Sequence, residues 1–223
     1  MKIKFIGTLV LMSLIISSVS CKGEKKNETE ANTAEEVKEA PVTAIVYNVD
    51  TTSSIIEWVG KKPTENHTGT LKIANGSVTA KDGKIESGSF TIDMNSITVT
   101  DLEGKGKTNL ENHLKGSKKE NEDHFFNVKQ FPTASFEMTG ISEKEGKTYL
   151  EGNLTIKGIT KNISFPATTS VEGDDVKLTT EVFTINRTNW NVNYASKSIF
   201  EDLGEKFISD DIELKIEVKA TKA

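Results

Sequence analysis

The sequence predicts an all-β fold, a single antiparallel barrel of about eight strands with one short helix in a long connection. Apolar residues from residue 45 onward recur with a period of two, which is typical of half-buried strands, and not with the 3.6-residue period of a helix. Glycine-containing dipeptides that favour tight turns separate these alternating runs. Residues 45–223 have the size of one domain, so we expect the barrel to be the whole globular part of the chain.

The first 20 residues have the features of a signal peptide. Lys2 and Lys4 precede an apolar stretch from Phe5 to Ile16, which is too short for a permanent membrane span. Small residues follow and lead to Cys21, the single cysteine, in a pattern that resembles a bacterial lipobox. We expect cleavage before Cys21 and lipidation of it, which would place the protein in the bacterial cell envelope, anchored to a membrane and facing the periplasm or the exterior. The alternative is an ordinary signal peptide followed by an incidental thiol.

Residues 21–44 predict a lipidated, disordered tether. They are mainly Lys, Glu, Asn, Thr and Ala, with almost no large apolar side chain that could offset the entropy of ordering the chain. A flexible segment of this length reaches about 25 Å on average, which would hold a small domain just off a membrane surface. A short helix over residues 33–38 is the alternative, although helices of that length are marginal in water.

The charge of the chain excludes one class of partner. Residues 1–20 hold two of the 28 basic residues and none of the 33 acidic residues, so the chain from Cys21 onward carries a formal charge of −7. Nucleic-acid binding requires a basic face that neutralises phosphates. We therefore expect no nucleic-acid partner.

Alternating runs between residues 55 and 218 predict the strands, and the dipeptides between them predict the turns. The clearest runs are Ile55 to Val59, Phe90 to Met94, Phe136 to Thr139, Leu154 to Lys157 and Ile212 to Val218. The turn dipeptides are Asn75-Gly76, Asp82-Gly83, Glu145-Gly146, Lys157-Gly158 and Gly173-Asp174. Together they indicate an antiparallel meander.

One segment, Asp101 to Gln130, breaks the alternation and predicts a short helix followed by a turn-rich connection. Long connections in compact domains often have a function, such as covering one end of a barrel. Phe125 and Phe126 suit a lid over the barrel and suit equally a plug that completes its core.

An ordered set of short motifs runs through the barrel region. They are Tyr47-Asn48-Val49-Asp50 with Trp58 shortly after, His67-Thr68-Gly69, Phe90 to Ile97, His113-Leu114-Lys115, Phe125-Phe126, Phe131 to Phe136, Gly152 to Lys161, Asn186 to Val192 and Asp210 to Ala220. By this set the chain resembles the YceI-like family, in a lipoprotein form. The resemblance implies a lipocalin-like barrel that binds a polyisoprenoid or related long-chain lipid. Asn186 departs from the family, which often has an acid there, and residues 116–122 lengthen the segment before Phe125.

An eight-stranded barrel either fills with side chains or encloses one small ligand. A site for a long apolar chain needs aliphatic and aromatic walls with a few polar groups near one end. The predicted lining residues are Trp58, Phe90, Ile92, Phe136, Met138, Leu154, Ile156, Phe165, Trp190 and Phe200. Each of them alone would also suit an ordinary core.

Arg187, His113 and Lys115 are the candidates for contact with a lipid head group. The planar guanidinium of Arg187 suits a phosphate or pyrophosphate, although a salt bridge within the protein would use it equally well. His113 could instead be a hydrogen-bonded residue that anchors the long connection.

Enzymatic and metal sites are not expected. The three histidines are scattered, lipidation would consume the only cysteine, and the sequence has no nucleophile elbow or phosphate-binding glycine loop. We therefore predict no catalytic residue, no metal and no cofactor apart from a bound polyisoprenoid or quinone-like lipid. The predicted function is that of a membrane-anchored lipid-binding protein, a monomer because a closed barrel has no free edge. The alternatives are a packed barrel that acts as a periplasmic interaction module without ligand, and a lipid-modifying enzyme.

Overall fold

The computed structural model describes residues 27–37 and 41–223. The predicted signal peptide and Cys21 lie outside the described residues. The elements in chain order are β1 (Ile45–Val49), β2 (Ile55–Lys61), β3 (Asn66–Lys81), β4 (Lys84–Val99), α1 (Gly104–Lys115), β5 (Thr133–Lys144), β6 (Lys147–Ile156), β7 (Ile159–Glu172), β8 (Asp175–Thr180), β9 (Phe183–Asn186) and β10 (Asp211–Lys222). Three 3-10 turns, η1 (Lys119–Asn121), η2 (Arg187–Trp190) and η3 (Gly204–Lys206), lie in the connections.

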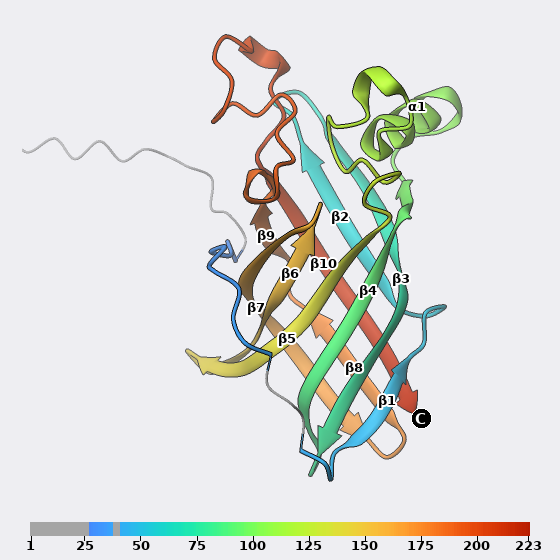
Figure 1. The fold of residues 1–223 in the computed structure, drawn as a ribbon, viewed down its shortest axis with the longest axis vertical. Helices are drawn as coiled ribbons and strands as arrows, with labels where there is room; N and C mark the ends of the chain where they lie inside the picture. Colours follow the sequence, from blue (N-terminus) through green and yellow to red (C-terminus); the bar gives the residue numbers. More distant parts are fainter. Residues whose placement is uncertain (1–26, 38–40) are drawn as a thin grey trace, which may run out of the picture.

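The ten strands form one antiparallel sheet that closes on itself (Figure 1). Strand β10 closes the ring, because it pairs with β2 on one side and with β8 on the other. Two positions of the ring are each shared by two short strands: β1 and β2 both lie between β10 and β3, and β8 and β9 both pair with β10. The ring therefore has about eight strand positions, and the predicted all-β barrel with one short helix is confirmed.

Three of the predicted turns are two-residue hairpin turns with positive φ at both positions. These are Asp82-Gly83, Glu145-Gly146 and Lys157-Gly158, and this backbone matches the twist of the flanking strands. Gly173, with a φ of 62°, lies between β7 and β8 as expected. The turn predicted at Asn75-Gly76 is wrong, because both residues lie inside β3 beside a register shift. Gly76 is needed there for close approach: a Cβ would lie 2.8 Å from the Ser89 carbonyl oxygen.

Residues 27–37, which the sequence assigned to a disordered tether, lie on the outside of the barrel wall (Figure 1, blue). We refer to residues 27–35 as the strap. On one side, the Thr29 N–H donates to the Thr184 carbonyl of β9 at 2.9 Å, and the Thr184 N–H donates to the Asn27 carbonyl at 3.2 Å. On the other side, the main chains of Asn32 and Asn162 of β7 exchange two hydrogen bonds of 2.9 and 3.0 Å. The prediction of a disordered tether is therefore wrong for this part of the chain.

The strap fills a seam in the barrel wall. Strand β7 pairs with β6 through its first half and with β8 through its second half, whereas β9 pairs with β10. In the described part of the chain, no ladder joins β9 directly to the first half of β7. The facing backbone groups of these two strands need hydrogen-bond partners, and the strap supplies them. The composition of the segment could not reveal this, because its binding depends on backbone groups and not on apolar area.

Buried polar side chains reinforce the strap. The Thr29 hydroxyl is buried and donates to the Thr184 carbonyl at 3.0 Å. The Asn153 side chain of β6 accepts from the Glu35 N–H at 3.0 Å and donates to the Glu35 carbonyl at 2.7 Å. The neighbouring Asn162 amide, also buried, donates to Thr139 and Asn153. The folded unit therefore extends upstream of residue 45.

Among the described helices, α1 has 12 residues, and none is both long and apolar enough to cross a bilayer.

Two strand glycines provide a test of how tightly the wall is packed. Gly152 lies beneath the Phe136 ring, so that a Cβ would lie 2.3 Å from that ring and 2.7 Å from the Glu137 carbonyl oxygen. We expect Gly152→Ala to lower the free energy of unfolding by about 1–3 kcal/mol, because the ring must leave its position. Urea unfolding followed by far-UV circular dichroism measures this change.

Gly140 is the matched control, because a Cβ there would meet the Glu151 carboxylate at an ordinary 3.5 Å. We expect Gly140→Ala to change the stability by less than about 0.5 kcal/mol. Equal losses in both variants would contradict this account of the wall.

Candidate ligand-binding cavity

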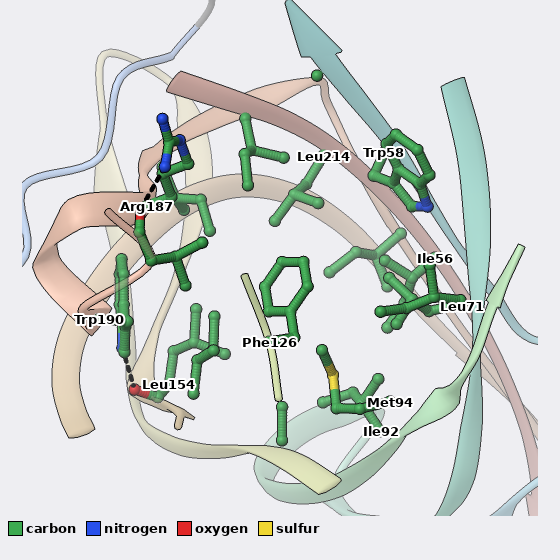
Figure 2. Close-up of a pocket in the computed structure, with 18 of the residues that line it drawn as sticks. Ile56, Trp58, Leu71, Ile92, Met94, Phe126, Leu154, Arg187, Trp190 and Leu214 are labelled. Atoms are coloured by element: carbon green, nitrogen blue, oxygen red, sulfur yellow. Dashed lines mark hydrogen bonds between the residues drawn. The ribbon is translucent and has the colours of Figure 1, made fainter. Parts of the chain in front are cut away.

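The barrel encloses a cavity of about 200 Å³. The lining side chains come from β2 to β10 and from the two long connections, and nearly all of them are aliphatic or aromatic (Figure 2). Such walls offer water very few hydrogen-bond partners, so the cavity favours an apolar occupant. A packed barrel, the alternative that binds no ligand, would have no such space.

Eight of the ten predicted lining residues line the cavity. They are Trp58, Phe90, Ile92, Phe136, Leu154, Ile156, Phe165 and Trp190. Met138 does not line it, because its sulfur packs against Gly88 of the neighbouring part of the wall, where a Cβ would lie only 2.8 Å from it. Phe200 is also absent from the lining, because it lies on the surface of the connection between β9 and β10 with 47% of its side chain exposed.

Sequence reasoning missed several lining residues. The missed residues include Ile56, Leu71, Ile73, Met94, Ile97, Leu110, Leu114, Ile163, Leu178, Phe183 and Ile185. Most of these lie at alternate positions of the strands, so the period-two pattern carried the signal. Leu110 and Leu114 of α1 had no such signal, because the side of a helix that faces a barrel depends on how the two pack.

The walls keep aromatic side chains in place over glycines. Trp58 of β2 pairs with Gly69 of β3, and a Cβ at residue 69 would lie within 2.5 Å of the indole ring. The Nε1 of Trp190 donates to the Leu154 carbonyl at 3.1 Å, which holds η2 against β6. The two tryptophans therefore lie at fixed positions on different sides of the cavity (Figure 2).

The connection between β4 and β5 covers one end of the barrel, which we call the mouth. Leu110 and Leu114 of α1, together with Phe125 and Phe126, line the cavity from this end. Figure 2 shows the Phe126 ring in the middle of the circle of lining side chains. The connection therefore covers the cavity at this end, and we call residues 100–132 the lid.

Arg187, a predicted head-group residue, lines the cavity, but its guanidinium forms its hydrogen bonds with the protein backbone. Its guanidinium donates to the backbone carbonyls of Ser209, Val192, Tyr194 and Ile208. Burial lowers the pKa of the guanidinium, and the Asp210 carboxylate at 3.7 Å opposes this shift. The structure favours the alternative in which Arg187 forms internal contacts, and its head-group role stays a prediction.

The other two head-group candidates do not line the cavity. His113 of α1 lies 2.8 Å from His124, measured between Nε2 and Nδ1, and its ring contacts Phe125 and Tyr194 edge-on at 5.1 and 5.0 Å. The alternative reading of His113, as a hydrogen-bonded anchor of the connection, fits this geometry. Lys115 is the last residue of α1, and its carbonyl accepts from the Val128 N–H.

The charged and titratable groups at the mouth are different from those predicted. Besides Arg187, the lining includes Lys61, Lys62 and His67, which lie where β2 ends and β3 begins. Lys62 forms an ion pair with Glu65 at 2.7 Å, and His67 lies 2.8 Å from the Asp101 carboxylate. In the described residues, no cluster of three or more His, Cys, Asp or Glu side chains could hold a metal ion.

An antiparallel barrel closed around an apolar cavity defines a lipocalin-like protein. The YceI-like domain model matches residues 47–220, and the chain therefore belongs to the YceI-like family.

Known relatives agree with this assignment. The YceI proteins of Salmonella arizonae and Salmonella newport are each 29% identical over 109 residues, which cover 48% of this chain and 51% of the relative. The match thus spans about half the length of these curated relatives. Among solved structures, BcnA of Burkholderia cenocepacia has a TM-score of 0.60 and 24% identity, covering 78% of this chain and 99% of BcnA. A polyisoprenoid binding domain from Saccharophagus degradans has a TM-score of 0.55 and 12% identity, covering 80% of this chain and 99% of that domain. These two structures share the fold.

His113 predicts a pH dependence of stability. Burial lowers its pKa, and the neighbouring His124 and Lys62 act in the same direction. A histidine whose pKa is lower in the folded state binds its proton more readily when unfolded, so its contribution is complete above about pH 6.5 and is lost as the pH falls below that value. We expect the wild type to lose stability between pH 7.5 and 5. We expect His113→Gln, which keeps an amide nitrogen near His124, to lose less.

Urea unfolding at several pH values, followed by tryptophan fluorescence, measures this difference. Parallel pH profiles for the wild type and His113→Gln would contradict the assignment.

Proposed function

We propose that this protein binds a polyisoprenoid or similar long-chain amphiphile non-covalently inside the barrel, while a lipidated Cys21 holds it at a membrane. The observation that carries the proposal is the apolar cavity under the mouth. Transfer of one methylene group from water to an apolar site contributes about 0.8 kcal/mol, so a chain of 15 carbons would gain on the order of 10 kcal/mol before the costs of ordering.

The size of the cavity bears on how a chain enters. Pockets for drug-sized ligands usually measure about 300–1,000 Å³, whereas this cavity measures about 200 Å³. Phe126 lies in the middle of the lining side chains (Figure 2). A long chain in the barrel would therefore require Phe126 to move aside and its own polar end to remain at the mouth, near Lys62 and His67.

The comparisons support the ligand class and favour binding over catalysis. The structural neighbour from Saccharophagus degradans is described as a polyisoprenoid binding domain, and YceI-like family members are binding proteins rather than enzymes. We extend both properties to this chain as part of the proposal.

The membrane anchor and the location rest on the sequence. The signal peptide and the lipobox-like residues before Cys21 support export, cleavage and lipidation. The proposed mature form is residues 21–223, a monomer in the cell envelope that faces the periplasm or the exterior. A membrane anchor suits this ligand, because a long-chain lipid stays in membranes and not in water.

Extraction of lipids from the purified mature protein, followed by mass spectrometry, tests ligand binding. The Leu154→Trp variant fills the cavity from its wall, and the cavity should accept the larger ring with a loss of less than about 1.5 kcal/mol in stability. We expect the wild type to carry a prenyl lipid in a fixed molar ratio and Leu154→Trp to carry at least tenfold less.

Glu137→Trp is the matched control, because Glu137 is exposed on β5 beside the lining residue Phe136. It adds the same ring to the outer face and should retain the lipid. A wild type that stays empty and takes up no added prenol would overturn the proposed function.

Cys21→Ala tests the anchor separately. We expect this change to move the protein from the membrane fraction to the soluble fraction after cell lysis, because the lipid attachment is lost, while lipid uptake by the purified protein is retained. Immunoblots of the two fractions and metabolic labelling with a fatty-acid analogue measure this outcome. Unchanged fractionation and undiminished labelling would contradict the anchor.

A further inference from the structure

The connection between β9 and β10, residues 191–210, forms one side of the mouth, and we call it the mouth loop. Figure 1 shows it at the same end of the barrel as α1, whereas β1 and the C-terminus lie at the opposite end. Tyr194 of the mouth loop contacts His113, His124 and Phe125 at ring distances of 5.0, 4.0 and 5.4 Å. The mouth loop and the lid therefore meet in one aromatic cluster at the mouth.

Two large apolar side chains of this loop, those of Ile199 and Phe200, are exposed to solvent, and we call this pair the apolar tip. Ile199 and Phe200 are adjacent in sequence and have 46% and 47% of their surface exposed. Tyr194, in the same loop, is also partly exposed. The place of these side chains on the loop that borders the opening of an apolar cavity, and not exposure alone, favours an interaction surface there.

The backbone holds this apolar tip in place. The Phe200 N–H donates to the Ser196 carbonyl at 2.9 Å, and the Ile208 N–H donates to the Ala195 carbonyl at 2.8 Å. The base of the loop is fixed by the four hydrogen bonds from Arg187 to backbone carbonyls. The exposure of Ile199 and Phe200 is therefore a property of an ordered loop.

The strap determines which end of the barrel lies nearer to the anchor. Cys21 lies six residues before Asn27, so an anchored chain extends about 20 Å at most before it reaches the strap. The strap is bonded to Thr184, which lies opposite Glu213 of β10. From Glu213 the mouth end of β10, at Asp211, is about 7 Å away along the strand, and the far end, at Lys222, is about 30 Å away.

The charges of the loop indicate how it would bind. The loop carries two basic and four acidic residues, a formal charge of −2, and these are Lys197, Lys206, Glu201, Asp202, Glu205 and Asp210. The Lys197 ammonium lies 4.9 Å from the centre of the Phe207 ring. The loop has no excess of basic residues that would attract an anionic surface. Attachment through this loop should therefore depend on apolar insertion and be insensitive to salt.

We propose that Ile199 and Phe200 insert into the surface of a lipid bilayer, so that the mouth of the barrel faces the membrane and takes its ligand directly from it. This inference rests on the proposed lipid-binding function and adds the orientation of the protein and the route of the ligand. The bilayer is the surface that the apolar tip contacts, for two reasons. The tip adjoins the opening of the apolar cavity, and the anchored strap keeps that end of the barrel near the membrane.

Vesicle flotation and lipid uptake test the docking surface. The mature protein carrying Cys21→Ala, which lacks the anchor, is mixed with phosphatidylcholine vesicles that contain a fluorescent farnesol analogue. We expect the additional double change Ile199→Ser and Phe200→Ser to lower the vesicle-bound fraction and the uptake rate at least tenfold. Phe200→Trp should raise both, because Trp favours the membrane interface.

The matched control is the double change Ile45→Ser and Val46→Ser. These residues of β1 are 43% and 44% exposed at the opposite end of the barrel, and their replacement should leave vesicle binding and uptake unchanged. Thermal unfolding confirms that each variant is folded.

Equilibrium binding of the same farnesol analogue in dilute detergent, without vesicles, separates the two proposals. The mouth-loop variant should bind there with wild-type affinity. Wild-type vesicle uptake by the mouth-loop variant, or loss of uptake in the β1 variant alone, would overturn the docking surface. Failure of the unaltered protein to bind the analogue in either assay would overturn the proposed function itself.

Discussion

Backbone hydrogen bonds close the wall of the barrel, and the cavity can exist only because this closure is complete. A barrel with an apolar, unfilled interior has less side-chain packing than a solid core, so its wall must satisfy its own polar groups. Strand β10 closes most of the ring by pairing with β2 and with β8. The remaining seam, between β7 and β9, is closed by the strap. The cavity, the mouth and the position of the N-terminal segment all follow from how this wall is completed.

Backbone groups at the mouth also have hydrogen-bond partners, but there a side chain supplies them and not a neighbouring strand. Arg187 donates its hydrogen bonds to four backbone carbonyls of the mouth loop. Tyr194 then joins this loop to the lid through stacked and edge-on ring contacts. A cation that looked suited to a ligand phosphate in the sequence therefore organises the opening through which a ligand would pass.

Cavity and core use the same residue types, and this limited what could be predicted about the site. Leu154 and Phe165 line the cavity, whereas Met138, on the strand next to Leu154, packs against Gly88. All three are apolar residues in strands whose sequences alternate between apolar and polar residues. Met138 faces the same side of β5 as the lining residue Phe136, so alternation alone does not separate a residue that lines the cavity from one that packs against a neighbouring strand.

Local sequence patterns predicted the all-β class, three of the hairpin turns, the short helix between β4 and β5 and eight residues of the cavity wall, because alternation and positive-φ turn residues act over a few neighbouring positions. It also carries the whole case for a lipid anchor at Cys21. Three features became evident only in the folded chain: the strap joins the wall, Asn75-Gly76 lies within β3, and Arg187 donates to backbone carbonyls. These features depend on contacts between distant residues, such as Thr29 with Thr184, which are 155 positions apart. Such contacts form only after the barrel has brought their partners together.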